Sequence, residues 1–215
     1  MSTKPLFITL GIVVTLVFTG AILGWWFWQN HPASAPKAET AQNTNTNEKT
    51  ADPKEHNYVD VDFARKMIVH SQQGVQIADM AKNKATDDGV RQLANSISTE
   101  LSNNSKQYSD WLTEWNETYY NLSDFPEMEG HDMYPTHPGM ASLGDLNALE
   151  SADGKSVDDL FLRLMIAHHE GVIEMEDGGY FNKMQFGEMI SLRNETLKRQ
   201  ADEIQTMKQL QANGE

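Results

Sequence analysis

The feature that most constrains the fold is a short sequence pattern that occurs twice. Residues 63–71 align without a gap with residues 161–169, 98 positions later, and Phe, Arg, Met, Ile and His coincide in the two copies. Within each copy the apolar residues recur every three or four positions, which is the period of one helix face. Duplication of a helical hairpin would produce such a repeat, so the pattern predicts a bundle of helices.

The periodicity of the whole domain predicts four amphipathic helices, at about 60–84, 86–120, 156–177 and 182–211. We expect Asp60 or Asp62 to cap the first helix, Thr86 and Asp87 the second, and a capping box of Ser156 and Asp159 the third. Residues 121–155 have no sustained period and contain three prolines, so they are expected to form a long loop. No segment alternates as a half-buried strand does. The chain is therefore predicted to be all-α, a four-helix bundle of two hairpins joined by that loop.

An apolar segment precedes this domain. Residues 6–28 contain no charged residue, follow Lys4 and end with three tryptophans, which predicts a transmembrane helix with its N-terminus inside. A cleaved signal peptide is the alternative, because Ala33-Ser34-Ala35 resembles a cleavage site. Either interpretation implies export. The predicted divisions are a membrane anchor (1–29), a flexible linker rich in Ala, Thr, Asn and Pro (30–58) and the helical domain (59–215).

The amino-acid composition excludes several kinds of functional site. The chain has no cysteine, which excludes disulfides, zinc–thiolate sites, iron–sulfur clusters and thiol catalysis. Its net charge is −14, from 17 basic and 31 acidic residues. Such a surface repels nucleic acid and attracts cations, so nucleic acid is not an expected partner.

Methionine and histidine lie together on the two repeated helices. Residues three or four apart on a helix are neighbours, so each repeat places a methionine one turn before a histidine. A methionine and a single histidine on an apolar face can also be ordinary core residues, and this alternative stays open for Met67 and Met165. Three histidines at repeat-related positions favour metal binding more strongly. The candidate ligands on the helices are Met67, His70, Met165, His168, His169 and Met175.

The long loop carries a second group of such residues. Three methionines and two histidines fall within 13 residues, where no helical face exists for them to fill. The loop is expected to bind metal separately and more loosely than the helices, although it could instead cover the core. Its candidate ligands are Met128, His131, Met133, His137 and Met140.

Thioether sulfur is a soft donor that selects Cu(I), and imidazole also binds copper. The methionine-rich, cysteine-free donor set therefore indicates Cu(I) as the bound ion, with Ag(I) as an expected competitor. Zinc would prefer cysteine, histidine or carboxylate.

The motif F-x-x-x-M-I-x-H-H, present twice in a four-helix chain, resembles the CopM-like family, long known only as a domain of unknown function. The resemblance covers about residues 60–210 and implies a ferritin-like bundle, export, and copper binding through Met and His. The second copy matches at Phe161, Met165, His168, His169 and Met175. The first copy departs from the pattern, with Ser71 in place of the second histidine and Ile77 in place of a methionine.

The leading hypothesis is a copper-binding protein without enzymatic activity, in the periplasm or outside the cell, serving copper tolerance or delivery. A haem-binding four-helix electron carrier is one alternative, with haem held between a Met and a His. A structural module without metal is another. A ferritin-type oxidase is disfavoured, because no glutamate lies three residues before a histidine.

Overall fold

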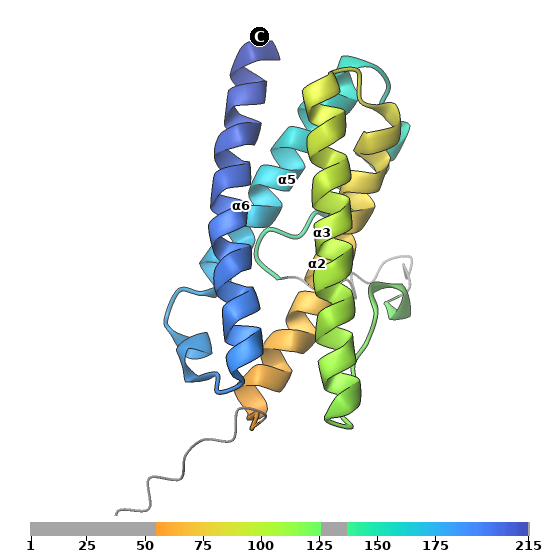
Figure 1. Cartoon of the computed structure of the whole chain (residues 1–215). Helices are drawn as coiled ribbons and strands as arrows, with labels where there is room; N and C mark the ends of the chain where they lie inside the picture. Colours follow the sequence, from red (N-terminus) through yellow and green to blue (C-terminus); the bar gives the residue numbers. More distant parts are fainter. Residues whose placement is uncertain (1–54, 126–136, 215) are drawn as a thin grey trace, which may run out of the picture. The chain divides into compact units, whose positions relative to one another are not determined.

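The structure of the chain is a computed structural model, which describes residues 55–125 and 137–214. Within these two ranges every regular element is a helix and none is a strand, which confirms the all-helical prediction (Figure 1). Five α-helices and two short 3₁₀ helices are present in the described ranges. In chain order they are α2 (Tyr58–Lys84), α3 (Asp88–Glu114), η1 (Leu122–Asp124), α4 (Leu143–Ser151), α5 (Lys155–Met175), η2 (Tyr180–Lys183) and α6 (Gly187–Gly214).

The four long helices form the bundle that Figure 1 shows. Helix α2 packs along α3, and α5 packs along α6, so each predicted hairpin is present. The two hairpins contact each other mainly through α2 and α5. These are the two helices that carry the repeated pattern, so the repeats meet in the centre of the bundle.

Several predicted boundaries and caps are wrong. Asn57 caps α2, because its side chain accepts hydrogen bonds from the backbone of Val59 at 2.7 Å and Asp60 at 3.2 Å. Helix α2 therefore begins at Tyr58, which the sequence had assigned to the linker. The expected capping box of Ser156 and Asp159 does not form, since α5 already begins at Lys155, after Gly154. Helix α3 ends at Glu114, earlier than predicted, and α6 begins at Gly187, later than predicted.

Helix α4 lies in the segment that was predicted to be a loop. Ser142 and Asp145 cap its first turn reciprocally, and only Leu146 and Leu149 are buried. Two apolar residues in nine are too few to reveal a helical period, which is why the sequence pattern missed this helix.

The predicted membrane anchor and nearly all of the predicted linker lie outside the described residues. In the ranges that the structure describes, no helix combines the length and the apolar character that crossing a bilayer requires.

Two apolar clusters fill the bundle, one in each half. One is built around residues such as Phe63, Tyr108 and Met189, and the other around residues such as Ile77, Phe161 and Met207. On all four long helices, buried polar residues stand between the segments that belong to the two clusters. We call this set the polar layer. It comprises His70, Ser71, Gln73, Asn104, Ser105, His168, His169, Thr196 and Gln200.

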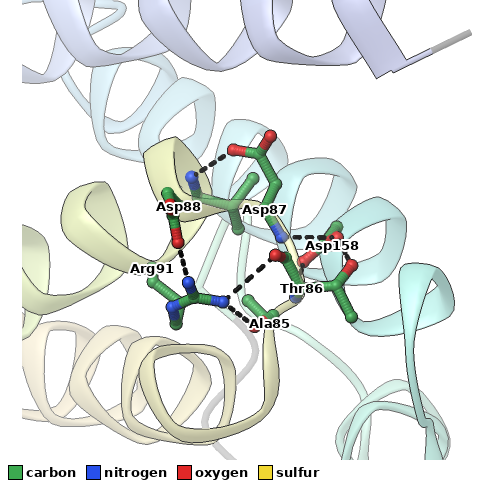
Figure 2. A network of polar contacts seen from close by, with 7 residues as sticks. Ala85, Thr86, Asp87, Asp88, Arg91 and Asp158 are labelled. Atoms are coloured by element: carbon green, nitrogen blue, oxygen red, sulfur yellow. Dashed lines mark hydrogen bonds and ion pairs between the residues drawn. The ribbon is translucent and has the colours of Figure 1, made fainter.

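The repeat also contains a pair of buried aspartates that join the two hairpins. Asp60 and Asp158 are again 98 residues apart. Asp158, on α5, accepts hydrogen bonds from the backbone N–H groups of Thr86 at 2.9 Å and Asp87 at 3.2 Å, in the turn between α2 and α3 (Figure 2). Asp60, on α2, accepts from the backbone ahead of α6 in the same manner. Each hairpin thus supplies an aspartate that accepts hydrogen bonds from the segment connecting the two helices of the other hairpin.

Candidate metal centre

Two repeat-related histidines meet at the centre of the polar layer. His70 comes from α2 and His168 from α5, and their ring centroids are 3.9 Å apart, with the planes tilted by 36°. His70 is 1% exposed and His168 is fully buried. The duplication predicted from the sequence therefore brings two imidazoles into contact inside the bundle.

The hydrogen bonding of the two rings differs. The Nε2 atom of His70 lies 3.2 Å from the carbonyl oxygen of Pro138, to which it donates. Both ring nitrogens of His168 are buried and make no hydrogen bond of good geometry in the described chain, although the backbone of His70 and Gly139 lies close enough to act on the ring and raise its pKa. A buried polar group without a partner typically costs about 1–3 kcal/mol. Such a cost suggests that His168 serves a purpose other than stability.

Burial keeps these imidazoles neutral. The pKa of His70 is lowered from 6.5 to about 3, chiefly by burial and to a smaller extent by the nearby rings of His137 and His169, while the hydrogen bond to Pro138 acts in the opposite direction. Burial, together with His70 and His169, also holds the pKa of His168 well below its ordinary value. A neutral imidazole keeps a lone pair on one nitrogen, which is the form that binds a metal ion.

His169 is the third buried histidine of the layer. Its ring centroid lies 6.3 Å from that of His168. Its Nε2 atom is 2.7 Å from a carboxylate oxygen of Glu203 on α6. Its Nδ1 atom is buried and has no partner within the described ranges.

The end of the long loop covers this layer. Gln73 holds it with two hydrogen bonds to the backbone of Ala141. The side-chain N–H of Gln73 donates to the carbonyl oxygen of Ala141 at 2.9 Å, and the side-chain oxygen of Gln73 accepts from the backbone N–H of Ala141 at 2.7 Å. Gly139, in the loop, has φ +79° and lies against the backbone of α5. Gly171, on α5, faces the loop closely, because a Cβ there would stand only 2.1 Å from the carbonyl oxygen of Pro138. These glycines allow the loop backbone to touch the helix beside His168.

The methionines of the two repeat copies lie in different apolar clusters. Met67 and Met165 are buried, each one turn from its histidine, but they belong to different apolar clusters and so lie on opposite sides of the polar layer. Met175, the last residue of α5, is half-buried against the cluster that contains Met67. The two histidines of the repeat therefore meet in the polar layer, while the two sulfurs flank it.

The loop candidates divide into two groups. His137 and Met140 are described and half-buried, and the Nδ1 atom of His137 has no partner among the residues that the structure describes. Burial lowers the pKa of His137. Met128, His131 and Met133 lie outside the described residues.

No three His, Asp or Glu side chains of the described chain are arranged to hold a metal ion by themselves. A site of the zinc type, made of nitrogen and oxygen donors alone, is therefore not preformed in this part of the molecule. The thioethers of Met67 and Met165, which are donors for soft ions, lie on the two sides of the polar layer.

Comparison with known proteins identifies the family. The family model described as a domain of unknown function, DUF305, matches residues 60–211. The chain belongs to the DUF305 family. No curated protein matches the chain.

Three solved structures resemble this member of the family. A DUF305 protein from Streptomyces coelicolor, for which secretion is proposed, is 28% identical, with 72% of this chain and 91% of that chain covered and a TM-score of 0.62. CopM in the Cu(II)-bound form is 27% identical, with 73% and 97% covered and a TM-score of 0.58. CopM in the Cu(I)-bound form is 26% identical, with 73% and 98% covered and a TM-score of 0.55.

Sequence reasoning missed three residues that shape the site. Gln73, which holds the loop, and Glu203, which pairs with His169, have no signal in a single sequence, because both act across helices. Asp158 did have a signal, since it repeats Asp60 at the offset of the motif.

Proposed function

We propose that this protein is an exported, membrane-tethered copper-binding protein that captures Cu(I) for copper tolerance or delivery. It holds the ion and performs no catalysis on it. The observation that carries the proposal is the pair of buried imidazoles His70 and His168, whose ring centroids are 3.9 Å apart, with neither nitrogen of His168 in a hydrogen bond of good geometry in the described chain. Copper-bound forms of the similar protein CopM support copper as the ion.

The proposed donors are the buried imidazoles and the thioethers beside them. His70, His168 and His169 supply nitrogen, while Met67 and Met165 supply sulfur from the two sides of the polar layer. Thioether and imidazole together favour Cu(I) over harder ions, and Ag(I) should compete for the same donors. His70 and His168 must turn their rings away from face-to-face contact for both to reach one ion.

The loop is proposed to be the entry point. Its donors are Met128, His131, Met133, His137 and Met140, and Met175 stands at the end of α5. The sequence of this segment has no helical period, and ordering such a segment around an ion costs roughly 1–2 kcal/mol for each residue fixed, so this site should bind more loosely than the helices do. Substitution of the three loop methionines by Leu should lower the number of Cu(I) ions bound while the tightest binding event persists.

The central test is anaerobic competition for Cu(I) between the full-length protein and a colorimetric chelator. The double variant His70→Leu/His168→Leu should bind Cu(I) about 100-fold more weakly or worse, since even outer partners of metal ligands are worth 10–100-fold. His56→Leu is the matched control, because His56 stacks on Trp115 outside the polar layer, with ring centroids 4.0 Å apart. Equal affinity in the double variant and the control would reject the proposal.

Sulfur ligation is tested in the same assay with a second matched pair. Met165→Leu should weaken Cu(I) binding, while Met207→Leu, which changes another fully buried methionine of the same apolar cluster, should not. If the two variants bind alike, Met165 is a core residue and not a ligand.

A further inference from the structure

The pair formed by His169 and Glu203 is a short polar contact at the layer that the proposed function leaves unexplained. The imidazole is fully buried, the carboxylate side chain is 12% exposed, and the two atoms Nε2 and Oε2 are 2.7 Å apart. A carboxylate can only accept a hydrogen bond, so Nε2 of His169 is the ring nitrogen that donates to Glu203, and in a ring that carries one proton this proton resides on Nε2. The lone pair then remains on Nδ1, which is buried and unpartnered within the described chain.

A second carboxyl group, that of Glu100, lies near Glu203. Glu100 on α3 faces it, and burial together with the negative charge of Glu203 raises the pKa of Glu100 to about 7. Glu100 also pairs with Arg199 at 3.1 Å. Glu100 thus has Arg199 as its partner, while Glu203 has the imidazole of His169, at 2.7 Å.

The pair of His169 and Glu203 has no counterpart in the other copy of the repeat. Ser71 occupies the position of α2 that corresponds to His169, and its hydroxyl is buried without a partner in the described ranges. The symmetry of the fold therefore does not require a histidine at 169. His169 also lies close enough to His70 and His168 to lower the pKa of both. The ring centroid of His169 lies 6.3 Å from that of His168.

We propose that Glu203 is a positioning residue for the copper site: it holds His169 in the tautomer protonated on Nε2, so that Nδ1 can bind the soft cation taken up beside His70 and His168. This inference rests on the proposed function. Histidine ligands commonly donate their second N–H to a carboxylate, which orients the ring and raises its basicity. Loss of such a partner typically weakens metal binding by about 10–100-fold.

The first experiment measures Cu(I) affinity of the full-length protein by anaerobic chelator competition. Glu203→Gln should weaken binding by about 10–100-fold. Glu176→Gln is the matched control, because Glu176 also joins α5 to α6, through Arg193, and both of those side chains are 13% exposed. The two variants lose the same charge and a similar helix-to-helix contact, yet only the first touches His169.

The second experiment needs no copper. Long-range ¹H–¹⁵N correlation spectra of the histidine rings, with His169 assigned through His169→Gln, should show the Nε2–H tautomer in the wild type. Glu203→Leu should shift His169 toward the Nδ1–H form, and Glu176→Gln should leave it unchanged. If Glu203→Leu does not fold, Glu203→Gln serves in its place, since its amide can donate to Nε2 as well as accept from it.

The outcomes separate the two claims. Weaker Cu(I) binding and a changed tautomer in the Glu203 variants alone would support the positioning role. If the wild type binds Cu(I) and Glu203→Gln binds as tightly as Glu176→Gln, Glu203 merely ties two helices and the inference is wrong, while the proposed function stands. If the wild type does not bind Cu(I), the proposed function fails and the positioning role fails with it.

Discussion

At the scale of single residues, the polar layer is a place where stability and function oppose each other. Most buried polar groups in proteins have a hydrogen-bond partner, but His168 has none of good geometry in the described chain, although it is fully buried. Gly74 makes room for it, because a Cβ there would lie 2.8 Å from Nε2 of His168. The fold thus accommodates an imidazole whose nitrogens do not help to hold the chain together.

Replacing His168 should therefore stabilise the metal-free protein. We expect His168→Leu, which has a similar volume, to raise the free energy of unfolding by about 1–2 kcal/mol, because it removes a buried polar group that has no partner. Urea unfolding of the copper-free protein measures this change. A decrease in stability would show that the imidazole makes a structural contact.

The buried histidines also determine how stability depends on pH. The pKa of His70 is about 3 in the folded chain and 6.5 in the unfolded chain, and that of His168 is also depressed. Between these values the unfolded chain binds more protons, so stability of the copper-free protein should fall as the pH falls below 6.5. Each histidine contributes up to about 1.4 kcal/mol per pH unit.

Glu100 acts in the opposite sense. Its pKa is raised from 4.5 to about 7, so the folded chain binds the extra proton in that interval and gains stability as the pH falls. Unfolding measured between pH 6.5 and 4.5 should accordingly show a steeper loss in Glu100→Gln and a shallower loss in His70→Leu. Identical slopes in all three proteins would contradict the assignment of these groups.

At the scale of helices, the repeat made the fold predictable, whereas the residues at which the helices begin and end could not be predicted in the same way. The spacing of Phe63, Met67 and His70 revealed the buried face of α2, because a long amphipathic helix repeats its signal over many turns. Caps depend on one or two residues, so Asn57 was missed and Ser156 was wrongly chosen. The facing of His70 and His168 followed from the duplication, whereas the contact of His169 with Glu203 required the packing of α5 on α6.

The aspartate pair gives a prediction for the elements. Asp60 and Asp158 each accept several backbone hydrogen bonds from the other hairpin. Hydrogen bonds to a charged group contribute about 1.5–3 kcal/mol, so Asp158→Ala and Asp60→Ala should each destabilise the protein by at least that amount. The control is Asp159→Ala, which removes an exposed partner of Lys155. Thermal unfolding that is the same in all three variants would show that the aspartates do not join the hairpins.

At the scale of the whole molecule, two apolar clusters enclose the polar layer, and together they supply a core that needs no metal. Proteins that depend on an ion for folding lack such a core. We therefore expect the far-UV circular dichroism spectrum to remain helical when copper is removed with a chelator. Loss of the helical signal on chelation would mean that the metal is part of the fold, and the clusters would not suffice.

The measurement that tests the central claim most directly is X-ray absorption at the copper edge of the full-length protein loaded with one equivalent of Cu(I). The account predicts a first coordination sphere that contains both imidazole nitrogen and thioether sulfur, and loss of the imidazole contribution in His70→Leu/His168→Leu but not in His56→Leu. A spectrum that is unchanged in the double variant would place copper away from the polar layer and contradict the account.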